Sequence, residues 1–180
     1  MPETAATPLA ILADYEARAR RHARPLPQQE RAEEEWLGVG FDVAGQGYVA
    51  PLDEVAEILT PPAMSRVPGT RSWVMGVANV RGNLLPVMDL QAFLTGEPQR
   101  RGKRSRVLVV QHGGLVAGLL VAAVHGLRHF VAENEASEVP VEATPVLPYV
   151  RGAFRDAGGL WPVFSLRRLA ESPLFLRVAV

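Results

Sequence analysis

The residues of this chain that could do chemistry concentrate in GVANVRGNLLPVMDL, residues 76–90. An amide, a guanidinium and a carboxylate, on Asn79, Arg81 and Asp89, lie there among Val, Leu and Met. Such groups could form a catalytic cluster, a ligand site or a surface for another protein. The choice depends on the elements that position these side chains.

This stretch has the pattern of a β-hairpin. Gly82 and Asn83 stand between two apolar runs, and glycine in the first central position of a two-residue turn accepts a positive φ. Such a turn would place Arg81 opposite Leu84. Arg81 and Asp89 would then lie about five residues, or roughly 16 Å, apart along the ladder. The hairpin therefore does not predict a catalytic cluster.

Asp89 and Arg81 have structural explanations of different strength. Asp89 stands where a short helix, LQAFL, begins, and its counterpart before LRRLA is Ser165. Both residue types are good helix N-caps. The Arg81 guanidinium could grip a partner's carboxylate or carbonyl groups. It could equally be structural, because Arg151 occupies the same place in a second Val-Arg-Gly motif.

The rest of the chain offers little catalytic or metal-binding chemistry. His125 and His129 are four residues apart in a segment with strand character, and no third ligand is near, so we expect no metal site. The chain has no cysteine, which excludes disulfides and thiol nucleophiles. GGLVAG, 113–118, is interpreted as a hairpin turn, since no Gly-Lys-Ser/Thr follows it. We expect no catalytic residues, no cofactor and no enzymatic activity.

The composition is that of a folded protein whose net charge creates no strong electrostatic field. Apolar residues make up 48% of the 180, and 19 Lys and Arg balance 19 Asp and Glu. Binding to nucleic acid is therefore not expected, and the basic loop 99–106 lacks interleaved aromatic residues. The longest apolar run has ten residues, whereas a bilayer needs about 20. We expect a cytoplasmic protein with no direct membrane insertion.

Periodicity divides the chain into an N-terminal arm and a β-rich body. Apolar residues recur at helical spacing over residues 7–23, and prolines end this helix, so residues 1–35 are predicted to form a helical arm. From Trp36 the period changes to two, which predicts an all-β domain over 36–180.

The body contains an internal repeat. Val-Arg-Gly, a turn, Pro-Val, a capping residue and a short helix occur in both halves, with Arg81 and Arg151 70 positions apart. We therefore expect two similar β units, about 36–98 and 105–172, that share buried surface.

Four segments together resemble the CheW adaptor domain of bacterial chemosensory arrays, over about residues 37–170. They are GYVAPLDEVAEIL (47–59), VPGTRSWVMGVANVRGNLLPVMDL (67–90), GLVAGLLVAAVHGL (114–127) and VRGAF (150–154). The arm, the wording WVMGVANVRG and the ending FLRVAV resemble more closely the PilI-type members of this family, which serve type IV pilus twitching motility.

The resemblance implies two five-stranded, SH3-like β barrels. It also implies a noncatalytic adaptor that couples the cytoplasmic tip of a methyl-accepting chemotaxis receptor to the regulatory domain of a CheA-type histidine kinase. The protein would join membrane receptor arrays only through these partners. By this resemblance the receptor tip docks in the groove between the barrels, near Val55, Gly76, Arg81 and Gly118. The kinase contacts are implied to involve Leu84 and Gly152.

Three other functions stay open from the sequence. The chain could be the CheW adaptor of flagellar chemotaxis. It could be a small-ligand enzyme or binding protein that uses the cleft between the barrels, or a nucleic-acid module built on the basic loop.

Overall fold

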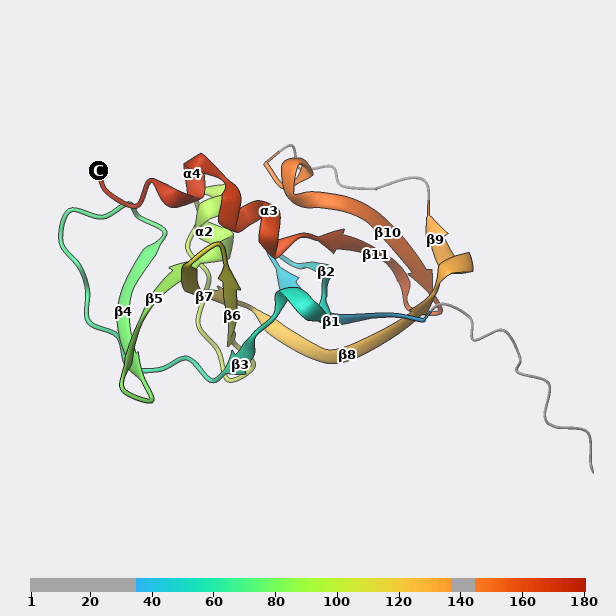
Figure 1. Ribbon diagram of the computed structural model, residues 1–180, viewed down its shortest axis with the longest axis horizontal. Helices are drawn as coiled ribbons and strands as arrows, with labels where there is room; N and C mark the ends of the chain where they lie inside the picture. Colours follow the sequence, from blue (N-terminus) through green and yellow to red (C-terminus); the bar gives the residue numbers. More distant parts are fainter. Residues whose placement is uncertain (1–34, 137–144) are drawn as a thin grey trace, which may run out of the picture. The chain divides into compact units, whose positions relative to one another are not determined.

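A computed structural model of the chain describes residues 35–136 and 145–180. The predicted arm, with its helix at 7–23, lies outside these residues except for Glu35, where the first strand begins. Two β-sheets dominate the described body (Figure 1). Sheet I has the strand order β3-β6-β7-β5-β4, and sheet II has the order β8-β1-β2-β11-β10-β9.

The eleven strands of the described residues have two to nine residues each, and two-residue turns join β1 to β2, β4 to β5, β6 to β7 and β10 to β11. They are β1 (Glu35–Val43), β2 (Gln46–Pro51), β3 (Glu57–Leu59), β4 (Val74–Val80), β5 (Asn83–Asp89), β6 (Arg106–His112), β7 (Leu115–Val121), β8 (Ala123–Val131), β9 (Glu135–Ala136), β10 (Val150–Asp156) and β11 (Gly159–Phe164). The helical elements are η1 (Leu52–Glu54), α2 (Leu90–Thr95), η2 (Ala132–Asn134), η3 (Leu147–Tyr149), α3 (Leu166–Glu171) and α4 (Pro173–Leu176). The predicted all-β class is confirmed. Sheet II has six strands rather than five because the two-residue β9 is added at the edge of β10.

Each sheet combines strands from both halves of the chain. β1 and β2 pair with β8 and β11 in sheet II, whereas β6 and β7 pair with β3 and β5 in sheet I. The first hairpin of each half therefore crosses to the other half's sheet. This corrects the expected division into one barrel over 36–98 and another over 105–172. Neither half forms a sheet alone, so the two halves are interlocked.

The internal repeat has a different spacing from the one expected. In the β4–β5 hairpin Gly76 pairs with Val87, and in the β10–β11 hairpin Gly152 pairs with Val163. Each partner in the second hairpin lies 76 positions after its counterpart, as 152 follows 76 and 163 follows 87. Both first strands carry a bulge immediately before this glycine.

The two Val-Arg-Gly motifs are not equivalent positions. At the spacing of 76, Arg81 corresponds to Ala157 in the second turn, and Arg151 corresponds to Met75 in the first bulge. Arg151 is therefore not the counterpart of Arg81, contrary to the expectation from the repeated motif, and gives no support to a structural role for Arg81.

The β4–β5 hairpin turns one residue earlier than predicted. Val80 pairs with Asn83, so Arg81 and Gly82 are the central turn residues, with φ of 53° and 86°. Two positive φ values define the type I′ turn that fits the twist of a hairpin. The Asn79 side chain accepts a hydrogen bond from the Gly82 N–H at 2.9 Å and so helps to hold Arg81 in this conformation.

Side chains from both sheets fill the seam between them. The shared core includes Phe41, Tyr48 and Phe164 of sheet II together with Leu108 and Leu119 of sheet I. Smaller cores lie on the other faces of sheet I and of sheet II. A partner could therefore contact the seam only at its rim. The docking groove predicted between the barrels is limited to this rim.

The two predicted helix caps are confirmed. Asp89 accepts a hydrogen bond from the Ala92 N–H at 3.0 Å, and Ser165 accepts one from the Arg168 N–H at 3.2 Å. Each satisfies a backbone donor that the first turn of a helix leaves unpaired. Both helices then pack leucines into the shared core.

A buried carboxylate ties the crossing between the sheets to α3. Glu54 lies in η1, which connects β2 of sheet II to β3 of sheet I, and it is only 6% exposed. The Ser165 hydroxyl lies 3.2 Å from both of its oxygens, and the Arg167 N–H donates to Oε2 at 3.0 Å. Arg151 Nη2 lies 3.7 Å from Oε1.

Candidate protein-docking surfaces

The hairpin tip, defined as the β4–β5 turn with Leu84, presents a charged and an apolar side chain to solvent. Arg81 Nη2 lies 2.5 Å from Glu57 Oε1, and Nη1 lies 3.3 Å from Oε2. Because Glu57 is on the edge strand β3, this bidentate pair joins β3 to the turn that follows the other edge strand, β4. Leu84 is 76% exposed. The tip therefore offers an accessible leucine beside an arginine that already binds a carboxylate of its own chain.

Strand pairing brings two of the four predicted receptor-binding positions, Gly118 and Gly76, to one row across sheet I. Arg81 contacts the end of this row through its ion pair with Glu57. From one edge to the other the row is Glu57, Val109, Gly118, Val87 and Gly76.

Gly118 and Gly76 shape this row from inside. A Cβ at Gly118 would lie 2.7 Å from Val107 Cγ1, and a Cβ at Gly76 would collide with the Ser65 carbonyl oxygen. Gly76 also has a φ of 141°, which residues with a side chain rarely adopt. Since both glycines are buried, they permit the close approach of neighbouring groups and cannot offer a side chain to a partner.

Val55 follows η1 and lies at the rim of the seam. It is half-buried and packs against the shared core. The next N–H, of Ala56, donates to the Val109 carbonyl at 2.8 Å. Val55 is therefore fixed between Glu54 and the row described above, with part of its surface accessible.

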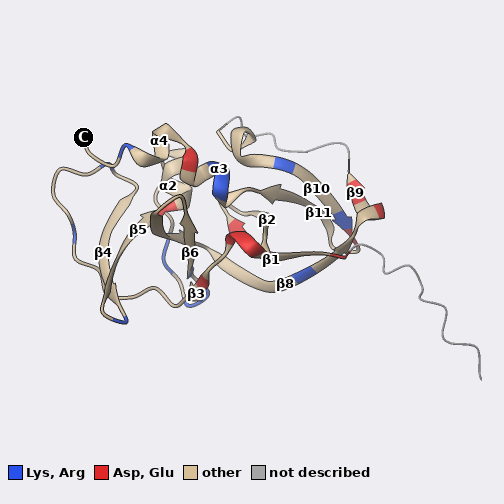
Figure 2. Ribbon diagram, in the orientation of Figure 1, with Lys and Arg blue, Asp and Glu red and all other residues tan. Residues whose placement is uncertain are grey.

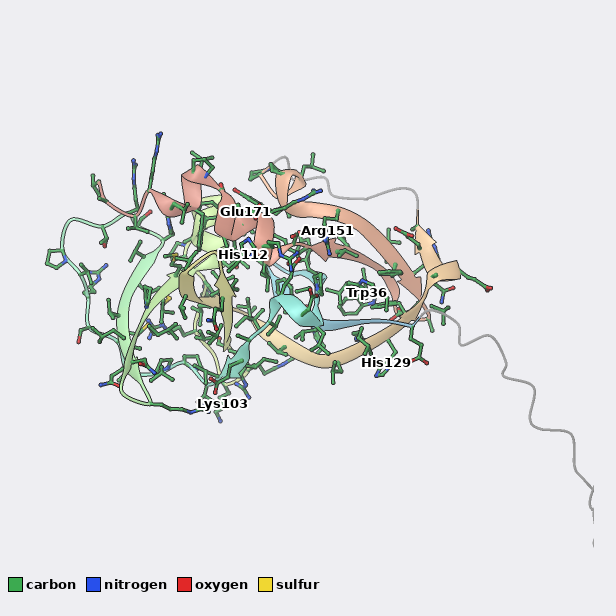
Figure 3. The ribbon with its side chains drawn as sticks, in the orientation of Figure 1. Trp36, Lys103, His112, His129, Arg151 and Glu171 are labelled. Carbon is green, nitrogen blue, oxygen red and sulfur yellow. The ribbon has the colours of Figure 1, made fainter. Side chains whose placement is uncertain are left out.

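Gly152 belongs to a separate surface on sheet II. It lines a pocket of about 380 Å³ together with Trp36 and Arg151, both labelled in Figure 3. Gly152 is the counterpart of Gly76 in the repeat. The two predicted kinase-contact residues, Leu84 and Gly152, thus lie on different sheets.

A second hollow, which we call the C-terminal groove, was not predicted from the sequence apart from Gly76. It has a volume of about 290 Å³ and lies between the segment before β4, the β4–β5 hairpin, the start of β7 and the chain after α3. Its lining is almost entirely apolar: Val67, Thr70, Val74, Gly76, Val77, Pro86, Met88, Leu115, Phe175, Leu176 and Val178. The apolar ending of the chain was visible in the sequence, but no local pattern places it against β4.

A third hollow, of about 390 Å³, opens at the rim of the seam. Trp73, Phe93 and Tyr149 form its aromatic lining, and Arg71 and Arg177 are its charged residues. Among the described residues its lining includes no carboxylate, so these residues offer no pair of acidic groups of the kind that general acid–base catalysis often uses.

Three histidines each approach a single carboxylate. His112 Nε2 lies 2.7 Å from Glu171 Oε1 (Figure 3), and His125 Nε2 lies 2.7 Å from Asp42 Oδ1. His129 is 3.8 Å from a carboxylate oxygen of β1. Within residues 35–136 and 145–180, no three His, Asp or Glu side chains gather as a metal site would require.

Membrane-spanning character is also not found in the described part of the chain. No helix there combines the length and the apolar composition needed to cross a bilayer.

A comparison with models of protein families shows the family to which this chain belongs. Residues 37–174 match the model of the CheW-like domain. The chain belongs to the CheW-like family. This CheW-like match includes both sheets, the hairpin tip and Gly152, and it ends immediately before Phe175 of the C-terminal groove.

Individual relatives refine the CheW-like assignment. The chain is 43% identical to protein PilI of Pseudomonas aeruginosa over 97% of both chains. It is 38% identical to protein FrzA of Myxococcus xanthus over 58% of this chain and 64% of that protein. The crystal structure of the scaffolding protein TtCheW from Thermoanaerobacter tengcongensis superposes with a TM-score of 0.65 at 26% identity, over 77% of this chain and 94% of that one. The predicted resemblance to CheW proteins, and to the PilI-type among them, is confirmed, as is the SH3-like barrel architecture.

Proposed function

We propose that this protein is a noncatalytic adaptor that couples the cytoplasmic tip of a methyl-accepting chemotaxis receptor to the regulatory domain of a CheA-type histidine kinase. It would act in the cytoplasm, attached to receptor arrays through these partners, and would control type IV pilus twitching motility. The likeness to PilI along nearly the whole of both chains supports this most strongly. The relatives named chemotaxis protein CheW match shorter parts of the chain, which favours the twitching pathway over the flagellar one.

The receptor contact in this proposal is the rim of the seam beside sheet I. Val55 and Arg81 are the accessible members of the predicted set, and Gly76 and Gly118 act by allowing the Ser65 carbonyl and the Val107 side chain to approach the row closely. Receptor binding would use the exposed guanidinium of Arg81, with Glu57 orienting it.

The kinase contact in this proposal has two parts. Leu84 at the hairpin tip supplies an apolar side chain that a partner could desolvate. Gly152 and the neighbouring Arg151 would supply a second contact on sheet II. Two separated surfaces suit a protein that must hold two partners at once.

Binding measurements on the full chain would test this function. Calorimetric titrations with a receptor-tip fragment and with a kinase regulatory domain should each give saturable binding. Leu84→Glu should weaken kinase binding about tenfold or more and leave receptor binding unchanged. Leu127→Glu is the matched control, because Leu127 is 57% exposed on β8 of sheet II and belongs to neither surface. If the unmodified chain bound only one of the two partners, or neither, the proposal would be refuted.

A further inference from the structure

The third hollow, which we call the aromatic hollow, is lined by the rings of Trp73, Phe93 and Tyr149. The Trp73 and Phe93 rings meet edge to face, with centroids 5.4 Å apart and an interplanar angle of 75°. The Tyr149 ring lies 6.0 Å from Phe93, and its hydroxyl lies 3.1 Å from Ser172 Oγ. The Trp73 Nε1 atom is buried, so Trp73 presents carbon rather than its N–H to the hollow. These surfaces suit a flat apolar group.

The size of the aromatic hollow is typical of a small-molecule site. Its volume of about 390 Å³ lies within the range of about 300–1,000 Å³ that such sites have. Pro145, Pro148 and Leu174 complete the lining. Because proline has no backbone N–H, the two proline positions cannot donate to an incoming strand. A compact ligand therefore fits this hollow better than an extended polypeptide.

The charged residues of the aromatic hollow are both basic. Arg71 and Arg177 are exposed members of its lining. Arg71 Cζ lies 5.8 Å from the centre of the Trp73 ring, and Arg71 Nε donates to the Ala179 carbonyl at 3.3 Å. The ion pairs found among the described residues all involve other side chains. Two guanidinium groups beside an apolar surface favour a ligand that carries a carboxylate.

The acidic residues close to this lining in the sequence have other positions or partners. Asp89 is buried and accepts the backbone hydrogen bonds that cap α2, and Glu97 is exposed after that helix. Glu171 lies 2.7 Å from a histidine of β6. Figure 2 shows red at the end of α3 and blue on the chain after α4. Glu138 and Glu142 lie outside the described residues, so one arm of the experiment replaces both.

We propose that the aromatic hollow binds a small aromatic carboxylate, with its ring against Trp73 and Phe93 and its carboxylate toward Arg71 and Arg177. Such a ligand would contact the segment before β4, helix α2 and the chain around α4 at once. Its binding should therefore stabilise the folded chain. None of these residues belongs to the receptor and kinase contacts proposed above, so the site is independent of them.

The probe is naphthalene-2-carboxylate, and naphthalene-2-carboxamide is its uncharged match. Each is titrated into the full chain with nitrogen-15 in the indole groups of its three tryptophans. The carboxylate should shift the Trp73 indole signal in a saturable manner and leave those of Trp36 and Trp161, on sheet II, unchanged. The amide should bind about fivefold more weakly or worse. Salt should weaken binding of the carboxylate and not of the amide.

Matched variants test the two parts of the site. Arg71→Gln combined with Arg177→Gln should lower the affinity for the carboxylate to that for the amide. Arg66→Gln is the control, because Arg66 is exposed in the same loop but is not in the lining. Leu174→Glu should weaken the carboxylate about fivefold or more by placing a like charge in the hollow. Leu176→Glu, on the same helix but in the C-terminal groove, should not.

A further variant concerns the glutamates outside the described residues. The chain with Glu138→Gln and Glu142→Gln should bind the carboxylate at least as tightly as the unmodified chain, because it carries fewer negative charges. Melting temperatures of all variants without ligand should stay close to that of the unmodified chain, and saturating carboxylate should raise the melting temperature of the unmodified chain.

Several outcomes would overturn this assignment. They are the absence of a saturable shift of the Trp73 signal, equal affinities for the carboxylate and the amide, or equal losses in the Arg66→Gln chain and the double arginine variant. Shifts confined to Trp36 or Trp161, or weaker binding by the double glutamate variant, would also contradict it. The receptor and kinase titrations do not use this probe, so the two proposals fail separately.

Discussion

Glu54 and Ser165 form a buried hydrogen bond between two parts of the chain that are 111 residues apart in sequence. The carboxylate also accepts from the Arg167 N–H and lies near Arg151. Because η1 connects the two sheets, this cluster fixes where the chain crosses from sheet II to sheet I and where α3 begins. It also fixes Val55, the next residue, at the rim of the seam.

Glu54→Ala should destabilise the protein by about 2–4 kcal/mol, because the Ser165 hydroxyl and a backbone N–H lose their buried acceptor. Urea unfolding followed by circular dichroism measures this change. The control is Asp53→Ala in the same turn, where the side chain is 74% exposed and the expected change is within about 0.5 kcal/mol. Equal effects of the two substitutions would contradict the role given to Glu54.

Gly118→Ala should destabilise the protein by about 1–3 kcal/mol, because the new methyl group meets the stiff, buried side chain of Val107 at 2.7 Å. Val107→Ala alone should also destabilise it, by leaving a cavity. In the double variant the two effects should compensate partly, so that the loss is smaller than the sum of the single losses. A strictly additive result would show that the two side chains do not compete for the same space.

Arg81→Glu should weaken receptor binding and place a negative charge beside Glu57. Because the pair is largely exposed, the loss of stability should be no more than about 1 kcal/mol. Adding Glu57→Arg should restore the stability but not the receptor affinity, since the partner would still meet a carboxylate at the hairpin tip. Restoration of both properties would assign Arg81 a purely structural role.

Burial in the shared core raises the pKa of the Tyr48 hydroxyl above its ordinary value. Folding therefore favours the neutral phenol, and this contribution is complete below the unfolded pKa of about 10 and is lost as the pH rises above it. We therefore compare stabilities between pH 9 and 11, about one unit on either side of the unfolded pKa. Over this range the free energy of unfolding should fall less for Tyr48→Phe than for the unmodified chain. Denaturant unfolding across this interval measures the difference, and parallel curves for the two proteins would contradict it.

The sequence predicted what depends on neighbouring residues. Period-two alternation located the hairpins, and the positions of Asp89 and Ser165 before short apolar helices identified both caps. The register of the β4–β5 turn was wrong by one residue, because glycine is acceptable in either central position. The Asn79 side chain, which helps to decide the register, acts through a hydrogen bond that spacing alone did not indicate.

Relations between distant segments could not be predicted. The exchange of hairpins between the halves depends on which apolar faces pack best, and both arrangements fit the same local pattern. The repeated Val-Arg-Gly motif suggested that Arg151 corresponds to Arg81, whereas strand pairing shows that Arg151 corresponds to Met75. Glu54 had no local signal for burial, because its partners lie on α3. The C-terminal groove likewise requires residues 67–77 and 175–178 to meet.

The most direct test of the central claim is the mass of the complex formed when the full chain, a receptor-tip fragment and a kinase regulatory domain are mixed, measured by light scattering after gel filtration. We predict one species that contains all three proteins, and a smaller fraction of this species at the same concentrations when Leu84→Glu is used. Mutually exclusive binding of the two partners, or an undiminished three-protein species with the Leu84→Glu variant, would contradict the account.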